Sequence, residues 1–536
     1  MAEAKGRKRP SSSSSKASVE ALMEEAETLK KRTSELASAF VSIGRKAMKP
    51  LMDQVKDEKR ENPNKMDFQK PLDMFEMALE LDEENEEASE AVSELVSIFE
   101  EEDLPRPPPN HEHPYDVIVV GCGASGVGMG LMLTKVFDLD SKRVLIVERG
   151  ERVGESFRRW PSEMRFISPS INTQGWTDSF DLNSVAFGTS PAYTLHSEHP
   201  SGQEYAHYLE ELVNANDLNI QFRTEVKSIK SIRRGGFTVE VAGEDVGETT
   251  KLRSRYVVWA AGEFQYPQGD DQMFPGSELC RHNSSVRSWK KLPGDDFVVI
   301  GGYESGMDAV FNLASSGKRC TAVSSTPYWS VTTDDPSTEL SPYTMERVRR
   351  AFAASSKPPR LLGPLRVFKV EKKGSEGYVV RARWGAPAEK SGGEHRTPIH
   401  EDYEEEVGEV GTEVALRTPH PPLLCTGFGG SVALGPAKDL FEWGEEGSGC
   451  MAGCPLLNEY DESTKTPGLF LSGPAVRHDK HVFCFVYKFR QRFGVVAEVI
   501  ARGLGFYTDD TIQRCRQMNM FLDDFECCKG ACGEAC

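Results

Sequence analysis

Two copies of one local pattern constrain the fold of this 536-residue chain more than any other feature. Each copy is a short apolar strand, a glycine-rich turn and a helix. The first turn is Gly121-Cys-Gly-Ala-Ser-Gly126, and the second, 180 residues later, is Gly301-Gly-Tyr-Glu-Ser-Gly306. A strand that enters a helix through such a turn is typical of dinucleotide-binding α/β units. The sequence therefore predicts two such units and two bound dinucleotides.

The three glycines of the first turn have separate roles. Gly121 permits the tight turn, Gly123 lets the backbone reach a pyrophosphate, and Gly126 lets the helix pack closely on the strand. The next strand, residues 143–147, ends in Glu148, 22 residues past Gly126, where a ribose hydroxyl needs an acceptor. These features in this order predict a complete dinucleotide site.

The second turn departs from the pattern at one position. Tyr303 stands where the fingerprint has its middle glycine, and Gly302 supplies the remaining freedom. The following strand, residues 319–323, ends in Ser324, with no acid to bind a ribose 2′-hydroxyl. The sequence therefore favours NADPH over NADH at this site. The alternative is a packing module that has no ligand.

Three further motifs give the chain a family resemblance. They are Val257–Gly262 (VVWAAG), Leu424–Gly427 (LCTG) and Pro467–Gly473 (PGLFLSG), the last followed by a predicted helix over 483–503. With the two turns they resemble the flavoproteins with two dinucleotide-binding domains, in the pyridine nucleotide-disulfide oxidoreductase superfamily, and within these the flavin-containing monooxygenase-like group. The resemblance covers residues 115–508. It implies an α/β fold in which a Rossmann-like NAD(P) domain is inserted in a Rossmann-like FAD domain.

The resemblance also implies FAD at the first turn and NADPH, rather than NADH, at the second. The residues that it assigns to the cofactors are Gly121, Gly123, Ala124, Ser125, Gly126, Glu148, Arg149, Trp160, Gly262, Gly301, Gly302, Ser305, Gly306, Ser324, Gly427 and Gly473. Ahead of the second turn, Phe274, Gly276, His282 and Trp289 loosely resemble the fingerprint of the monooxygenases, although His282 could equally be an ordinary surface residue.

The implied chemistry is hydride transfer from NADPH to FAD, with dioxygen as the acceptor of the electrons. A flavin hydroperoxide would then pass one oxygen atom to a small soft nucleophile or a carbonyl substrate. The sequence marks no catalytic side chain for this reaction, because the flavin makes the bonds.

Two other activities remain open. The first is a disulfide reductase similar to thioredoxin reductase, which passes electrons to a cysteine pair. Its candidates are the tail residues Cys527, Cys528, Cys532 and Cys536, which could equally bind a soft metal such as zinc or copper(I), or have no role. The second, of another class, is a non-catalytic scaffold with an FAD fold.

Charge and hydropathy limit the partners of the chain. Lys and Arg number 64 against 83 Asp and Glu, and the net charge of −19 repels nucleic-acid phosphates and anionic lipid surfaces. No apolar run reaches the roughly 20 residues of a membrane helix, and we see no secretory signal. We therefore expect a cytoplasmic enzyme for a small-molecule substrate. The basic cluster at residues 5–9 could be a targeting signal or a solvated tail.

The segments that flank the enzyme have a different composition. Near the N-terminus, apolar residues recur with the spacing of one helix face: Leu22, Ala26, Leu29, Leu36 and Phe40. This pattern predicts N-terminal helices that could bind a protein partner or self-associate. The predicted segments are a disordered tail (1–18), a helical extension (19–104), a Pro-rich linker (105–114), the first part of the FAD domain (115–293), the NAD(P) domain (294–414), the second part of the FAD domain (415–508) and a Cys-rich tail (509–536).

Overall fold

The computed structural model describes residues 13–55, 69–82, 85–101, 109, 114–170, 181–232, 235–243, 249–269, 273–330, 339–354, 357–386, 406–445, 451–479 and 481–525. The chain divides into two compact units. One is Met1–Pro107 with Ala501–Tyr507, and the other is Pro108–Ile500 with Thr508–Cys536. Among the described residues, no helix has the length and apolar content that a membrane crossing requires.

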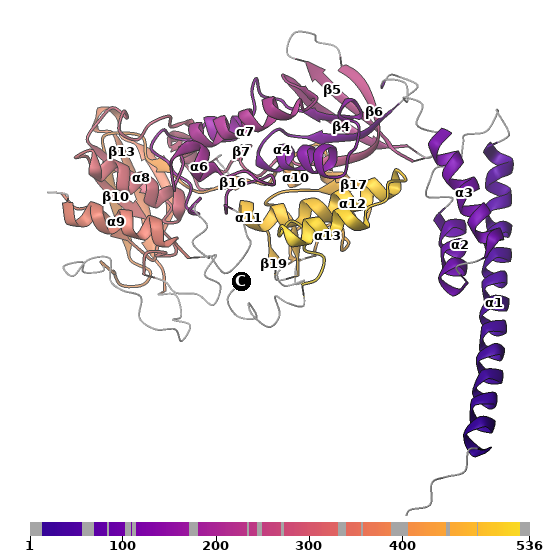
Figure 1. The fold of residues 1–536 in the computed structure, drawn as a ribbon. Coiled ribbons are helices and arrows are strands. Elements are labelled where there is room, and N and C mark those ends of the chain that lie inside the picture. The colour runs from indigo at the N-terminus through magenta and orange to yellow at the C-terminus, as the bar shows by residue number, and fades with distance from the viewer. Residues whose placement is uncertain are drawn as a thin grey trace, which may run out of the picture. The chain divides into compact units, whose positions relative to one another are not determined.

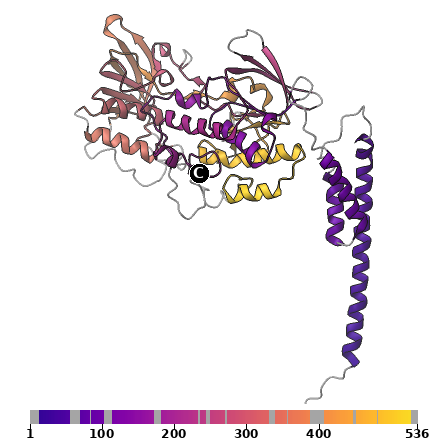
Figure 2. The ribbon, with the colours of Figure 1, turned by 45° about the horizontal axis from the view of Figure 1, so that its top comes forward.

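The described residues of the N-terminal unit form the helices α1 (Ser13–Val55), α2 (Gln69–Leu81) and α3 (Glu86–Glu101). Figures 1 and 2 show α2 and α3 packed alongside α1. Their common core consists of Ala37, Val41, Met48, Phe75, Ala78, Ala88, Ala91 and Leu95. The ring of Phe75 lies directly on Gly44, since a Cβ there would be 2.6 Å from the ring. Glycine therefore allows α2 to approach α1 closely.

Two details of this unit differ from the sequence prediction. The buried face of α1 carries Ala37 and Val41, whereas Leu29 and Leu36 of the predicted apolar face are 58% and 50% exposed. The small residues face the partner helices because they permit close packing. In addition, α1 begins at Ser13, inside the segment predicted to be disordered, and no glycine or proline interrupts the sequence from there to Gly44.

A seven-stranded sheet forms the centre of the second unit. Its strands run in the order β3-β2-β1-β6-β5-β4, and β17 pairs with β6. Pairing is parallel among β1, β2, β3, β6 and β17 and antiparallel among β4, β5 and β6. The strands are β1 (Tyr115–Val120), β2 (Val144–Val147), β3 (Ile220–Gln221), β4 (Thr224–Ser231), β5 (Phe237–Gly243), β6 (Thr249–Trp259) and β17 (Leu469–Leu471).

Two helices of this unit pack on each other at a glycine. In α4 (Ala124–Leu131), Gly128 is covered by the ring of Phe493, the first residue of α12 (Phe493–Gly503). A π-helical turn over Met132–Val136 continues α4. The other helices of this part are α5 (Glu155–Arg158), α6 (Pro191–Leu195), α7 (Gly202–Asn216), α10 (Ser431–Leu434), α11 (Val486–Phe489) and α13 (Asp509–Gln517).

The predicted helix over 483–503 starts too early and is not continuous. The preceding residues form a hairpin of β18 (Arg477–His478) and β19 (His481–Val482), in which Val482 pairs with Arg477. Helical structure begins only at Val486, and a 3₁₀ turn precedes α12.

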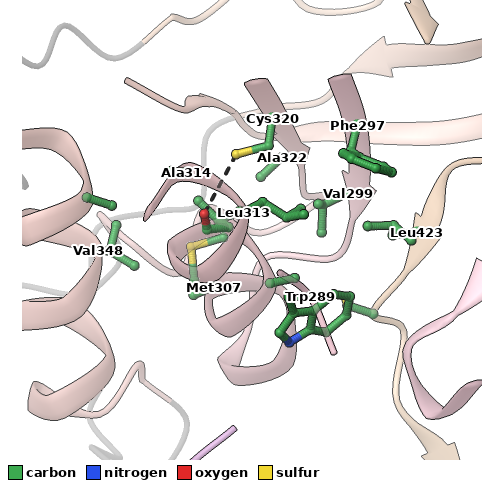
Figure 3. Packing of buried hydrophobic residues seen from close by; sticks show 14 of the residues in the cluster. Trp289, Phe297, Val299, Met307, Leu313, Ala314, Cys320, Ala322, Val348 and Leu423 are labelled. Carbon is green, nitrogen blue, oxygen red and sulfur yellow. Dashed lines mark hydrogen bonds between the residues drawn. The ribbon is translucent and has the colours of Figure 1, made fainter. Parts of the chain in front are cut away.

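A second, five-stranded parallel sheet has the order β11-β10-β9-β15-β8. Its strands are β8 (Arg281–His282), β9 (Asp296–Ile300), β10 (Arg319–Val323), β11 (Arg360–Leu362) and β15 (Leu423–Leu424). Figure 3 shows its core, where Leu313 of α8 (Glu304–Ser315) lies beside Val299, and Met307 lies on the side of α8 that faces Val348 of α9 (Pro342–Ala354). A three-stranded antiparallel sheet of β12 (Leu365–Lys372), β13 (Tyr378–Trp384) and β14 (Glu413–Thr418) accompanies it.

The strands of the second sheet lie in the sequence between β6 and β17 of the first. The chain passes between the sheets along β7 (Tyr266–Pro267) and β16 (Phe428–Gly429), which pair with each other. The second sheet extends beyond the predicted segment 294–414, because β15 pairs with both β8 and β9. The mixed α/β class predicted from the sequence is confirmed.

Candidate functional site

The first glycine-rich turn is shaped by close backbone contacts. Gly121 has φ +106°, and its N–H donates to the carbonyl of Val147 over 2.8 Å. A Cβ on Gly121 would lie 2.6 Å from the carbonyl oxygen of Ala260, and one on Gly126 would lie 1.8 Å from that of Gly121. Both positions therefore require glycine for the packing of the protein itself.

Gly123 is different, because the protein gives no reason for a glycine there. Its φ of −92° and ψ of −162° suit any residue, and a Cβ would meet no protein atom within 4 Å. The open space lies directly before Ala124, the first residue of α4. The turn thus keeps room for a ligand at the amino terminus of a helix, where phosphates bind well.

Glu148 follows β2 and faces this turn. Its carboxylate accepts the N–H of Cys122 over 2.8 Å and the N–H of Gly150 over 2.6 Å. These two bonds fix the carboxylate at the carboxyl edge of the sheet and leave lone pairs for a further donor. Such a group is suited to bind a ribose hydroxyl.

Two other strands deliver residues to the same edge. After β17, a Cβ on Gly473 would lie 3.2 Å from the Cβ of Ser125, and the Oγ of Ser125 bonds that of Ser472 over 2.9 Å. After β6, Ala260 donates to Val120 over 2.9 Å, and Gly262 follows with φ +70°. The structure therefore brings these predicted residues together, and they fit FAD because space, acceptor and helix terminus coincide.

Two predicted FAD residues take part in other contacts. Arg149 lies 3.9 Å from Glu225 in an exposed ion pair. Trp160 packs in an aromatic cluster, with its ring centre 5.3 Å from that of Phe157 and 5.2 Å from that of Phe166.

The second turn repeats the construction of the first. Gly301 has φ +117°, and its N–H donates to Val323 over 2.9 Å. A Cβ on Gly301 would lie 2.2 Å from the carbonyl oxygen of Cys425, and one on Gly306 would lie 2.1 Å from that of Gly301. Cys425 thus has here the place that Ala260 has at the first turn. The fold at this turn fits a dinucleotide, apart from the side chain of Tyr303.

Polar side chains around the second turn are partly engaged with the protein. Glu304, the first residue of α8, accepts the N–H of Ser341 over 2.5 Å, and Ser324 donates to the carbonyl of Thr326 over 2.6 Å. Ser305 is half-buried on the first turn of α8. Gly427 directly precedes β16, where the chain returns from the second sheet to the first, and its carbonyl contacts the Nε2 of His282 over 3.0 Å.

Of the residues resembling the monooxygenase fingerprint, His282 and Trp289 have separate surroundings. Burial lowers the pKa of His282, and the carbonyl of Gly427 offsets this in part. Trp289 is fully buried and donates to Asp308 over 2.9 Å, so it belongs to the core of the second sheet.

Glu263 is an acid that the sequence prediction did not include. It directly follows Gly262, and its carboxyl packs on Gly430, where a Cβ would lie 2.7 Å from Oε2. Its Oε1 is buried and has no hydrogen-bond partner within the part of the chain that the structure describes. Burial raises the pKa of Glu263 to about 7, and the N–H of Ser431 opposes this shift. The group is therefore half-protonated near neutral pH.

The replacement Glu263→Gln is expected to remove a component of the pH dependence of stability. The folded state holds the proton more tightly than the unfolded state, whose pKa is 4.5. The contribution of Glu263 to the free energy of unfolding is thus fully present below pH 4.5 and is lost as the pH rises to about 7. The loss amounts to at most about 3 kcal/mol. Thermal unfolding at about pH 5 and about pH 8 measures it. Equal pH dependence in wild type and variant would contradict the assignment.

The described cysteines near the turns are not activated. Burial raises the pKa of Cys122 well above its usual value and also raises that of Cys425. The same cause raises the pKa of Cys280 and Cys320 to about 12. Within the described ranges, no three His, Cys, Asp or Glu residues are grouped to hold a metal ion. The predicted tail candidates Cys527, Cys528, Cys532 and Cys536 lie outside the described residues.

Like Glu263, Ser472 was not among the site residues predicted from the sequence, although one sequence signal could have identified it. It is the hydroxyl residue next to Gly473 at the end of an apolar strand. For Glu263 the signal was an acid placed directly after Gly262, the last glycine of the Val257–Gly262 motif.

Comparison with protein families gives a match to one family model. A family model described as pyridine nucleotide-disulphide oxidoreductase matches residues 118–385, which is half of the chain. The matched range begins in β1 and includes both glycine-rich turns.

Several solved structures share the fold. A bacillithiol disulfide reductase from Bacillus cereus has a TM-score of 0.53 and 18% identity, over 73% of this chain and 99% of its own. An ornithine N-hydroxylase from Kutzneria sp. 744, with reduced FAD, NADP⁺ and L-ornithine, has a TM-score of 0.51 and 14% identity, over 73% and 99%. A cadaverine monooxygenase from Erwinia amylovora, bound to FAD, has a TM-score of 0.52 and 11% identity, over 74% and 96%. At these identities the likeness shows the fold alone.

Proposed function

The chain belongs to the pyridine nucleotide-disulphide oxidoreductase family, and from that membership we propose that it is an FAD-dependent oxidoreductase reduced by NADPH. The seven-stranded sheet is its FAD domain, and the five-stranded sheet is the inserted NAD(P) domain. The observation that carries this proposal is the first turn, where the open space at Gly123 meets the fixed carboxylate of Glu148.

Each group at the turns has a role in this proposal. The amino terminus of α4 binds the pyrophosphate of FAD, and Glu148 accepts from its ribose. At the second turn, Ser324 replaces the acid that would repel a 2′-phosphate, which favours NADPH. FAD, when bound, supplies the two-electron chemistry.

We propose dioxygen as the final acceptor. NADPH then supplies two electrons, one oxygen atom enters a small soft nucleophile or carbonyl substrate, and the other leaves as water with two protons. The raised pKa values of Cys122 and Cys425 count against these two thiols as the redox pair of a disulfide reductase, because a buried thiol is a poor source of thiolate. The reductase alternative therefore depends on the tail cysteines.

Product analysis tests the proposed reaction. The protein, reduced by NADPH without oxygen, is mixed with oxygenated buffer that contains amine or sulfide substrates. We expect an oxygenated product in proportion to the NADPH consumed. Consumption that yields only hydrogen peroxide, or that requires a disulfide substrate, would contradict the oxygenase proposal.

A matched variant separates the disulfide alternative. The variant carries serine in place of the four tail cysteines Cys527, Cys528, Cys532 and Cys536. We expect it to oxygenate its substrate as the wild type does. Loss of NADPH turnover with disulfide substrates in that variant would favour the reductase.

A further inference from the structure

The two turns can be compared directly at the position of the middle glycine. Gly123 has φ −92° and ψ −162°, and Tyr303 has φ −90° and ψ −167°. Each precedes the first residue of its helix and accepts the N–H four residues later, from Val127 and Met307. The Cα–Cβ bond of Tyr303 therefore points in the direction in which a Cβ on Gly123 would point.

That direction is the one from which a pyrophosphate approaches the turn. At the first turn this space contains no protein atom within 4 Å of a Cβ on Gly123. At the second turn it contains the side chain of Tyr303, which is 37% exposed and has its ring centre 4.9 Å from that of Tyr328. The Cβ of Tyr303 keeps its place whatever rotamer the ring adopts.

The second turn cannot move back to make room. A Cβ on Gly302 would lie 2.6 Å from the side chain of Ser324 and 2.7 Å from the ring of Trp329. Trp329 is 1% exposed, and a Cβ on Gly363 would lie 3.1 Å from another atom of its ring. Because a fully buried ring supports the turn from behind, the backbone at Tyr303 is fixed.

We propose that Tyr303 sets the affinity of the second site by holding the pyrophosphate of NADPH away from the amino terminus of α8. The inference rests on the proposed function, since it places NADPH at this turn. The attraction of a helix terminus for phosphate falls off over a short distance. NADPH therefore binds more weakly here than at an all-glycine turn, as suits a cosubstrate that leaves after each hydride transfer, whereas FAD stays bound.

The test is Tyr303→Gly in the full-length, FAD-loaded protein. Calorimetric titration with NADP⁺ measures affinity without reducing the flavin. We expect the Kd of the glycine variant to fall at least about tenfold. Tyr303→Phe, the matched control, keeps Cβ and ring and should change the Kd less than about threefold. Tyr303→Ala keeps only the Cβ, and its Kd should lie between those of the glycine and phenylalanine variants. The FAD content of each variant checks its folding.

A Kd in Tyr303→Gly equal to or higher than that of wild type would overturn the inference. Failure of the proposed function looks different, because NADPH would then leave the wild-type flavin oxidised. If NADPH reduces wild type but the glycine variant binds no tighter, the inference alone fails. If no variant binds NADP⁺ or NADPH, both fail.

Discussion

Replacing Gly123 with tyrosine is expected to give a folded protein that retains no FAD. The backbone angles at Gly123 suit any residue, and a Cβ there meets no protein atom within 4 Å, so the protein tolerates the new side chain. A bound pyrophosphate does not, because it must contact the turn at this point. We expect the affinity for FAD to fall more than about a hundredfold, roughly 3 kcal/mol. Flavin absorbance per chain measures the loss.

Gly243, at the end of β5, provides the matched control. A Cβ there also meets nothing within 4 Å, and its φ is not in the left-handed region. Gly243→Tyr should therefore keep both FAD and thermal stability. Full FAD content in Gly123→Tyr, or equal loss in Gly243→Tyr, would show that the first turn does not hold the cofactor.

Asp461→Asn is expected to cost about 3–5 kcal/mol of stability. Asp461 is fully buried, and its carboxylate accepts from the Nε of Arg492 over 3.0 Å and from the Nε2 of His478 over 2.5 Å. Asparagine tolerates the φ of +61° at this position, so the backbone is preserved. The variant leaves the guanidinium of Arg492, which is 1% exposed, without its counter-charge. Denaturant unfolding measures the change.

An exposed ion pair is the control for this prediction. The Nη2 of Arg383 lies 2.7 Å from the Oε1 of Glu413, and both side chains are at least half exposed. Glu413→Gln should cost less than about 1 kcal/mol, because solvent screens such pairs. If Asp461→Asn were as mild as this control, Asp461 would not be the buried counter-charge on which Arg492 depends.

The sequence was informative where function requires a particular backbone. Gly121 and Gly301 have positive φ, and a Cβ on Gly126 or Gly306 would clash with a carbonyl oxygen. Only glycine fits these positions, so the pattern of glycines predicts both turns from the sequence alone. Glu148 could be predicted because it ends the strand after the turn.

Features that depend on distant partners could not be predicted. Asp461 meets Arg492 only through tertiary folding, and the carboxyl of Glu263 packs on Gly430, which is distant in the sequence. The buried face of α1 depends in the same way on Phe75 of another helix. Periodicity identified a helix there, but only the packing of α2 decides which side is covered.

The central claim is that the first turn holds FAD and that NADPH at the second turn reduces it. Anaerobic titration of the purified full-length protein with NADPH, followed by flavin absorbance, tests it most directly. We expect a yellow protein with about one FAD per chain, bleached by about one equivalent of NADPH. Protein purified without flavin, or flavin that stays oxidised with both NADPH and NADH, would contradict the account.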